Sequence, residues 1–155
     1  MKIGFIGHRR IDAIRIRNKL KFEIEREIKL GYKSFCMGTH GDFDKLALSV
    51  CRELRNRYKD VEIEVVLTSF NKLKKILVYD DEYGKEFERP FSDVKTTFFE
   101  IEQEYFKRQI TLSNRKMIDE CDTLICYVDE KRSNSGAKLA LKYAKKKGLK
   151  IINLF

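Results

Sequence analysis

The sequence lacks the features that place a chain in a membrane or build a metal centre. No run approaches the roughly 18 apolar residues of a membrane-spanning helix, and the first residues become polar too soon for a secretory signal. The four cysteines show no C-x-x-C spacing and there are only two histidines, which argues against a zinc site or a disulfide framework. We therefore expect a cytoplasmic protein that has no metal or other cofactor and does not bind membranes.

Two common phosphate-binding motifs are also missing. Neither G-x-G-x-x-G nor G-x-x-x-x-G-K-[ST] occurs anywhere in the chain. This disfavours a dinucleotide-binding fingerprint and a P-loop as the source of any phosphate site.

The composition is that of a folded, basic domain. The chain has 155 residues, of which 43% are hydrophobic, so residues 1–155 are expected to form one domain with a full core. Three of the cysteines lie in or beside apolar runs, where cysteine behaves as a small hydrophobe. The net charge of +9 suits an anionic partner, which is a nucleic acid, a nucleotide or nothing specific. Six of the lysines lie in residues 138–150, mostly on one helix face, which favours a solvated surface over a nucleic-acid groove.

Short apolar runs alternate with helical patterns along the chain. Strands are predicted at 2–6, 33–37, 61–67, 123–128 and 150–154. Helices are predicted between them: one with Ile16, Leu20, Ile24 and Ile28 at one-turn spacing and a stop at Gly31, one over about 43–54, and further ones at 102–120 and 136–147. Strands alternating with helices predict a doubly wound α/β fold, with a mainly parallel five-stranded sheet flanked by helices.

Residues 70–100 interrupt this alternation. They hold the only proline, an acidic cluster and seven aromatic residues. A connection of this length is usually functional or irregular. We interpret it as a variable insertion, whose aromatic residues serve as a flap, a subunit contact or core filling.

Glycines and small polar residues follow three of the predicted strands. Because ligands bind beyond the carboxyl ends of parallel strands, and helix N-termini attract anions, these loops predict a ligand site. The residues concerned are Gly7, His8 and Arg9 after the first strand, Gly38, Thr39, Gly41 and Asp42 after the second, and Asp129, Ser133, Ser135 and Gly136 after the fourth.

Each loop also has a purely structural interpretation. Gly38 and Gly41 would permit a turn, and Asp42 and Ser135 would each cap the helix that follows. His8 would stack on or donate to a ligand, or simply be a satisfied turn residue. The presence of three such loops at one sheet edge favours the ligand site.

The order and spacing of these motifs resemble a known superfamily. Gly-Phe-Ile-Gly-His-Arg at 4–9, then Gly38, Gly41-Asp42, Asp44 and Ala47, resemble the SLOG superfamily of Rossmann-like proteins, and its YpsA-like branch most. That branch carries an R-N-x-x-M-x-D-x-x-D segment, which stands here as Ser-Asn-Arg-Lys-Met-Ile-Asp-Glu-Cys-Asp at 113–122. The resemblance covers residues 1–67 and about 103–155.

The resemblance implies a pocket for a nucleotide or nucleotide derivative. The three loops would form its walls, and Ser133, Ser135 and Gly136 would hold phosphate or ribose. Asn114 and Arg115 would lie near the pocket or at a subunit contact, since relatives often form homodimers or higher homo-oligomers. A sensor or a sequestering module is the implied role.

Some relatives are enzymes, and this sequence departs from their motif. The phosphoribohydrolases of the superfamily use a P-G-G-x-G-T-x-x-E loop, whose glutamate falls here on Ala140, and Ser113 replaces an arginine. No catalytic residue is therefore assigned, and a binding protein is favoured over an enzyme. An N-glycosidase or deoxyribosyltransferase, with Asp42, Asp44 or Asp129 as a relocated carboxylate, is the alternative. Nucleic-acid binding, as in the DNA-processing branch, is a further one.

Overall fold

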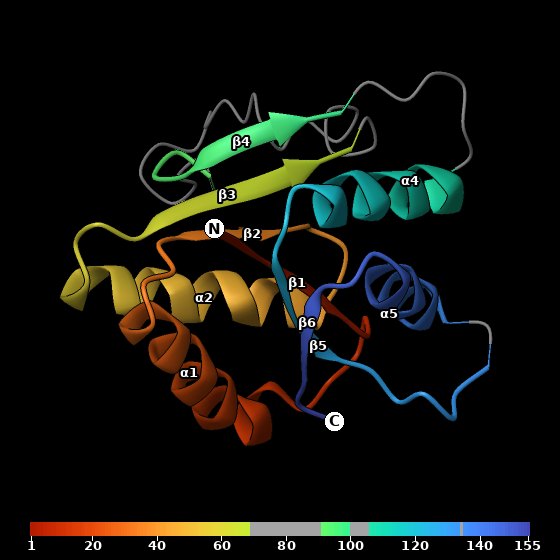
Figure 1. The fold of residues 1–155 in the computed structure, drawn as a ribbon, viewed down its shortest axis with the longest axis horizontal. Helices are drawn as coiled ribbons and strands as arrows, with labels where there is room; N and C mark the ends of the chain where they lie inside the picture. The colour runs from red at the N-terminus through yellow and green to blue at the C-terminus, as the bar shows by residue number, and fades with distance from the viewer. Residues whose placement is uncertain (69–90, 100–105, 134) are drawn as a thin grey trace, which may run out of the picture.

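The computed structural model describes residues 1–68, 91–99, 106–133 and 135–155. Figure 1 shows the elements in these ranges. They are, in chain order, β1 (Lys2–Gly7), α1 (Ala13–Lys29), β2 (Ser34–Met37), α2 (Asp42–Arg57), β3 (Glu62–Leu67), β4 (Lys95–Phe98), α4 (Phe106–Asp119), β5 (Thr123–Tyr127), α5 (Gly136–Lys146) and β6 (Lys150–Asn153).

The strands form one parallel sheet in the order β4-β3-β2-β1-β5-β6. This confirms the predicted doubly wound α/β fold. The chain adds strands outward from β1 to β4, and then returns to the other side of β1 with β5 and β6. The direction of winding therefore reverses between β1 and β5, which is the switch point where such sheets bind ligands.

The prediction of five strands is wrong by one. The additional strand, β4, lies within the stretch that we interpreted as an insertion, and it pairs with β3 through Lys95–Phe98. Its sequence Lys-Thr-Thr-Phe has a single apolar residue, and Lys95 and Thr96 are exposed at the edge of the sheet. An edge strand this short and polar carries no hydrophobic pattern from which it could be predicted.

The rest of the aromatic stretch is described only in part. Phe91 and Phe98 pack against the core on the α1–α2 side of the sheet, and Phe99 packs on the α4–α5 side. For these three residues core filling is the correct interpretation. The remaining aromatic residues of the stretch, and the flap or subunit contact proposed for them, lie at 70–90, outside the described residues.

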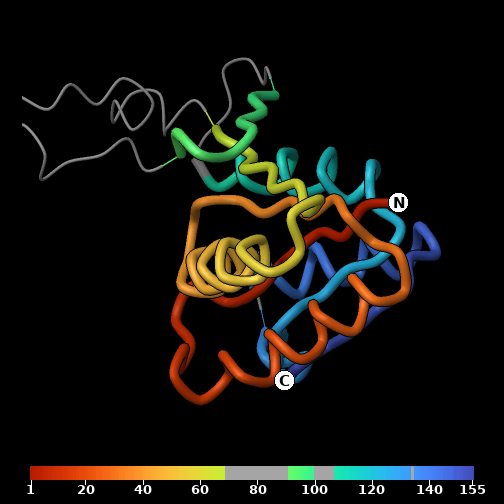
Figure 2. Tube along the Cα trace, turned by 90° about the vertical axis from the view of Figure 1, so that its left-hand side faces the viewer, coloured from red at the N-terminus to blue at the C-terminus, as the bar shows by residue number. Residues whose placement is uncertain are grey.

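The sheet is the middle of three layers (Figure 2). Alternate residues of β1 point to opposite sides, Ile3 and Phe5 toward α1 and α2, and Ile6 toward α4 and α5. Ile16, Leu20 and Ile24 of α1 are buried at the predicted one-turn spacing. The helix ends where predicted, because Gly31 has a φ of +108°, which glycine adopts without strain.

The cysteines are buried thiols, as the apolar surroundings of three of them predicted. All four are free, and the Sγ atoms of Cys36 and Cys121 lie 3.4 Å apart between β2 and the segment after α4. Burial raises the pKa of the Cys126 thiol to about 12, so this side chain is neutral and unreactive at physiological pH.

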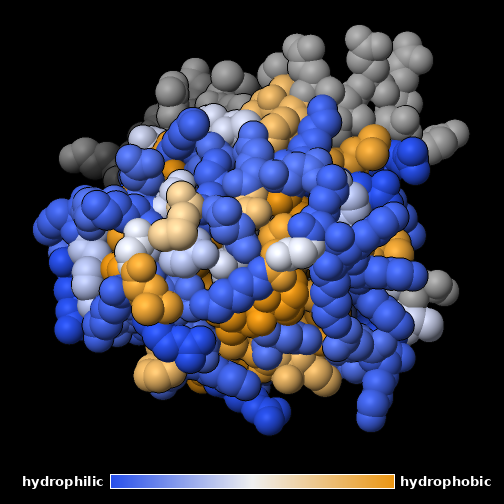
Figure 3. Space-filling model, viewed as in Figure 1, coloured by the Kyte–Doolittle hydropathy of each residue, from blue (hydrophilic) through white to orange (hydrophobic). Residues whose placement is uncertain are grey.

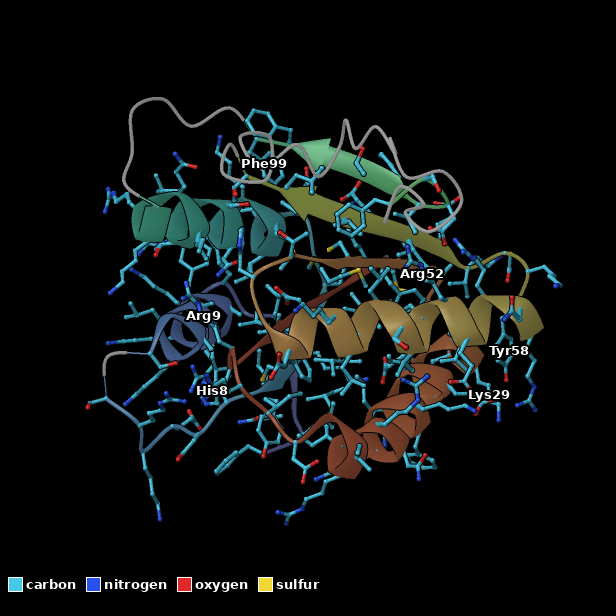
Figure 4. The ribbon with its side chains drawn as sticks, turned by 180° about the vertical axis from the view of Figure 1, so that it is seen from behind. His8, Arg9, Lys29, Arg52, Tyr58 and Phe99 are labelled. Carbon is cyan, nitrogen blue, oxygen red and sulfur yellow. The ribbon has the colours of Figure 1, made fainter. Side chains whose placement is uncertain are left out.

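A cluster of charges joins α2 to the segment that leads into β4. The carboxylate of Asp93 accepts hydrogen bonds from Arg52 Nη2 at 2.7 Å and Arg55 Nη2 at 2.6 Å, and Figure 4 shows Arg52 directed from α2 toward this side. The hydrogen bonds from Arg52, and those from Arg55, lower the pKa of Asp93 to about 2, although partial burial opposes them.

Replacing Asp93 by asparagine is expected to lower the free energy of unfolding by about 1 kcal/mol at neutral pH, a value discounted for the exposure of this carboxylate. Because the folded pKa is below the unfolded value, the contribution is complete above about pH 4 and is lost as the pH falls toward 2. Urea denaturation over this range should show parent and variant converging in acid. Asp60→Asn, which breaks one exposed pair with Lys33, should change stability less, and an equal effect would contradict the assignment.

The surface combines hydrophilic flanks with an apolar strip. Figure 3 shows hydrophobic surface between the α1–α2 side and α5, over the edge strand β6, where Ile151 and Ile152 are half-buried and Phe155 is exposed. Among the described residues, none of the helices combines the length and the apolar character needed to cross a membrane.

Candidate functional site

The three glycine- and serine-containing loops meet at one edge of the sheet, as predicted. They follow β2, β1 and β5, which are neighbours in the strand order, so the loops lie side by side at the switch point. Since all strands are parallel, this is also the edge toward which the N-termini of α2 and α5 face.

Hydrogen bonds join the loop that follows β1 to the loop that follows β2. The backbone N–H of Asp42 donates to the carbonyl oxygen of Arg9 at 2.8 Å, and the carboxylate of Asp42 accepts from the N–H of Ile11 at 3.3 Å. A Cβ atom on Gly41 would lie 2.8 Å from Arg9 Cα, so only glycine fits there. The prediction that Asp42 caps α2 is wrong. Gly41 is the N-cap. Asp42 is the first helical residue, and its carboxylate bonds the neighbouring loop instead of the start of its own helix.

His8 connects the loop that follows β1 to the loop that follows β5. Its Nε2 accepts from the backbone N–H of Asp129 at 2.9 Å, so the proton lies on Nδ1, which donates to Ser135 Oγ at 3.3 Å. Burial, followed by the nearby Arg132, lowers the pKa of His8, while Asp129 opposes the shift. His8 is therefore a buried, neutral histidine that fixes the switch point.

Ser135 begins α5 and is the cap that the sequence predicted. Its Oγ accepts from the N–H of Lys138 at 3.3 Å, in addition to the hydrogen bond from His8. With two hydrogen bonds accepted, the hydroxyl hydrogen of Ser135 remains to donate. Gly136 follows, and a Cβ atom there would meet nothing within 4 Å, so the first turn of α5 is open to a ligand.

A cavity of about 490 Å³ lies over these loops. Figure 4 shows His8 and Arg9 on the side of the molecule where α5 begins. Three cationic side chains, Arg9, Lys107 and Arg132, line the cavity, and Asp44 is the one acidic residue among the described lining residues. Ile6, Ile110 and Leu139 contribute apolar wall. The cavity thus combines positive charge, a helix N-terminus and apolar surface.

Asp44 and His40 form the end of the cavity beyond β2. One carboxylate oxygen of Asp44, Oδ2, accepts from the backbone N–H of His40 at 3.0 Å, and the His40 ring bonds Thr68 Oγ1 at 3.2 Å. Burial raises the pKa of Asp44 to about 6, although the His40 N–H favours the ionised form. Above that pH the cavity therefore holds a carboxylate surrounded mainly by positive charge.

The cavity contains a bit more than half of the residues predicted from the sequence. Those that line it are Gly7, His8, Arg9, Asn114, Ser133, Ser135 and Gly136. Those that do not line it are Gly38, Thr39, Gly41, Asp42, Arg115 and Asp129.

The residues outside the cavity have other contacts. The guanidinium of Arg115 lies over the ring of Tyr143, at 5.4 Å from its centroid, and so faces α5. The carboxylate of Asp129 accepts from the backbone N–H of Lys131 at 3.0 Å. A Cβ atom on Gly38 would lie 3.0 Å from Asp44 Oδ2, so this glycine makes room for the Asp44 carboxylate.

Apart from Asn114, the part of the wall formed by α4 was not predicted from the sequence, and neither was Arg132. Lys107, Ile110 and Thr111 line the cavity beside Asn114, one and two turns before it on α4. Their spacing of three, four and seven residues from Asn114 was the signal that could have found them. Arg132 lay within a loop that was already singled out, but only Asp129, the serines and the glycine of that loop were chosen.

A second cavity, of about 430 Å³, lies at the opposite edge of the sheet. Five of its six charged lining residues pair with one another: Glu64 with Lys2 at 3.3 Å and Lys95 at 3.1 Å, and Arg55 with Asp93. These charges are already balanced, so the cavity at the switch point is the stronger site. Among the described residues, no group of three histidine, cysteine or acidic side chains could hold a metal ion.

No family model and no curated protein matches this sequence. A function is therefore inferred from the geometry of the cavity and from the motifs.

Proposed function

We propose that the protein binds a nucleotide or nucleotide derivative in the cavity at the switch point, as a sensor or sequestering module. The observation that carries the proposal is the open first turn of α5 in a cavity lined by three cations. The resemblance to the SLOG superfamily, and to its YpsA-like branch, points to the same class of ligand.

The start of α5 supports a phosphate position. The first N–H groups of a helix have no partner within the helix and carry the positive end of its dipole. Gly136 and Ala137 bring this first turn to the cavity, and the Ser135 hydroxyl adds a donor. Arg132 lies in the same loop, and an arginine strengthens phosphate binding through two parallel hydrogen bonds.

The size and lining suit the rest of a nucleotide. Small-molecule cavities typically measure about 300–1,000 Å³, and the volume of this one, about 490 Å³, lies within that range. Ile6, Ile110 and Leu139 offer the apolar contacts that a base requires.

The test is isothermal titration with a panel of nucleoside monophosphates, ADP-ribose and cyclic dinucleotides. Arg132→Gln is expected to weaken the tightest ligand about tenfold or more, because it removes a charged hydrogen bond. Arg15→Gln on α1 is the matched control, since it removes the same charge from an exposed side chain outside the cavity, and it should leave affinity unchanged. If the whole panel fails to bind, or the two variants behave alike, the proposal is wrong.

An N-glycosidase or deoxyribosyltransferase is the second candidate, and one observation supports it. Of the three aspartates considered as relocated carboxylates, only Asp44 lines the cavity. A carboxylate near the sugar stabilises the positive charge that develops on it during glycosidic cleavage. This candidate predicts release of free base from a nucleoside monophosphate, lost in Asp44→Asn and kept in Asp129→Asn. Absence of free base after long incubation at high protein concentration would eliminate it.

A further inference from the structure

The outer edge of β6 has no neighbouring strand among the described residues. β6 stands last in the strand order and pairs with β5 alone. The backbone N–H groups of Lys150 and Leu154 donate toward β5, to the carbonyl oxygens of Asp122 at 3.1 Å and Cys126 at 2.8 Å. Because successive residues of a strand direct their backbone groups to opposite edges, the residues between them, such as Ile151, direct theirs outward. The edge therefore offers backbone donors and acceptors to an extended chain.

The side chains beside this edge are apolar. Ile151 and Ile152 are half-buried, and Phe155, whose ring lies 5.3 Å from that of Tyr127, remains 61% exposed. They form the apolar strip visible in Figure 3, with hydrophilic surface on both of its sides. The opposite edge strand, β4, is polar instead. An edge with free backbone groups and an apolar surface is the kind to which peptides add as a further strand.

Cations border the strip on its α1 side. Lys19 donates from Nζ to the carbonyl oxygen of Leu154 at 2.9 Å, and no carboxylate pairs with it among the described residues. Near the start of β6, Lys150 and Arg26 approach the same Oε1 atom of Glu27, at 2.9 and 3.9 Å. The side chains of Lys150 and Arg26 are about half exposed, whereas that of Glu27 is completely buried. The surface that faces water along this side is therefore positive.

A second copy of the chain suits this edge poorly. Antiparallel pairing of two β6 strands about a two-fold axis would bring α1 of one copy beside α1 of the other. Lys19 and Arg26 would then approach the same cations of the second copy, and like charges placed opposite each other destabilise a sheet. A strand that carries acidic side chains would meet these cations with the opposite charge.

We propose that the outer edge of β6 binds an extended acidic segment of a partner protein, which adds to the sheet as a further strand. Alternate side chains of such a strand face opposite sides of the sheet. Acidic side chains on the α1 side pair with Lys19 and Arg26. Apolar side chains on the α5 side pack beside Ile151. This inference does not depend on the proposed nucleotide site, which lies in a separate cavity.

The experiment measures binding of three fluorescein-labelled peptides of about ten residues to the full chain by fluorescence anisotropy. The first alternates glutamate and valine, and the second has lysine in place of each glutamate. The third is the first peptide with its central backbone nitrogens methylated, which removes the backbone donors and keeps the side chains. We expect the first peptide to bind at least about tenfold more tightly than either of the others.

Two outcomes with the peptides would overturn the inference. If the lysine peptide or the methylated peptide binds as tightly as the first, the charge or the backbone pairing is wrong. Absence of binding of the first peptide at about 1 mM would show that the edge accepts no acidic strand.

A pair of lysine variants locates the charge contribution. Lys19→Gln is expected to weaken binding of the glutamate peptide about threefold, because it removes one exposed charge pair. Lys29→Gln is the matched control, since Lys29 is exposed on the α2 side of the same helix, where its charge acts on the Glu25 carboxylate that Tyr58 bonds (Figure 4). It should leave the affinity unchanged. An equal loss in both variants would show a response to net charge alone and would overturn the inference.

Ile151→Pro tests the edge itself. Proline lacks the outward N–H and is tolerated on the solvent side of an edge strand, so binding of the glutamate peptide is expected to fall at least about tenfold while circular dichroism is retained. If this variant does not fold, the methylated peptide decides the same question. Sedimentation equilibrium tests the competing occupant. A dimer of the parent protein that the glutamate peptide fails to dissociate, and that Ile151→Pro abolishes, would assign the edge to a second copy and overturn the inference.

Discussion

Replacing Gly7 by alanine is expected to lower the free energy of unfolding by about 3 kcal/mol, at the upper end of the usual cost of overpacking a core. A Cβ atom at this position would lie 2.3 Å from Cγ and 2.5 Å from Cβ of Phe43. Phe43 is completely buried between α2 and the sheet, so its ring has no space into which to withdraw. Denaturation in urea, followed by circular dichroism, measures the change.

Two further variants test this cause. Gly136→Ala is the matched control, since a Cβ atom there meets nothing within 4 Å, and stability should change by less than about 0.5 kcal/mol. Phe43→Ala combined with Gly7→Ala should cost less than the sum of the two single substitutions, because alanine has no Cγ atom for the new Cβ to meet. If Gly7→Ala proves as stable as the parent, Gly7 is not required by packing, and its role at the cavity would need another explanation.

This difference between the two glycines explains what sequence analysis could and could not predict of the site. A glycine after a strand indicates either close packing or an exposed backbone, and the sequence does not distinguish them. Gly7 and Gly41 have close neighbours in Phe43 and Arg9, whereas Gly136 lies beside open space. The phosphate position that we propose therefore lies at the glycine that begins α5, which only the packing distinguishes from the others.

The fold was more predictable than the site, for a physical reason. Buried parallel strands are continuous apolar runs and their helices have a buried stripe, so β1, β2, β3 and β5 and the spacing of Ile16, Leu20 and Ile24 could be predicted. The edge strand β4 has neither pattern. Which residues of α4 line the cavity depends on how this helix is rotated about its axis against the sheet, and the sequence does not fix that rotation. In the structure, Lys107 and Asn114 face the loops while Arg115 faces Tyr143.

The second large effect on the free energy of unfolding is expected from an ion pair at the amino-terminal edge of the sheet. Glu27 of α1 is completely buried, and its Oε1 accepts from Lys150 Nζ of β6 at 2.9 Å. Its other oxygen is buried without a hydrogen-bond partner among the described residues, and the next cation, Arg26 Nη2, lies 3.9 Å from Oε1. Lys150 therefore supplies most of the compensation for a carboxylate that is removed from water.

Lys150→Met is expected to lower the free energy of unfolding by about 3 kcal/mol at neutral pH, because breaking a buried ion pair leaves an uncompensated charge in the interior. The double variant Lys150→Met with Glu27→Gln should recover most of this loss, since a neutral amide costs much less to bury than a carboxylate. Thermal and urea denaturation of the four proteins complete a double-mutant cycle. Additive effects of the two substitutions would show that Lys150 contributes through its aliphatic packing alone, and that Glu27 is compensated by another group.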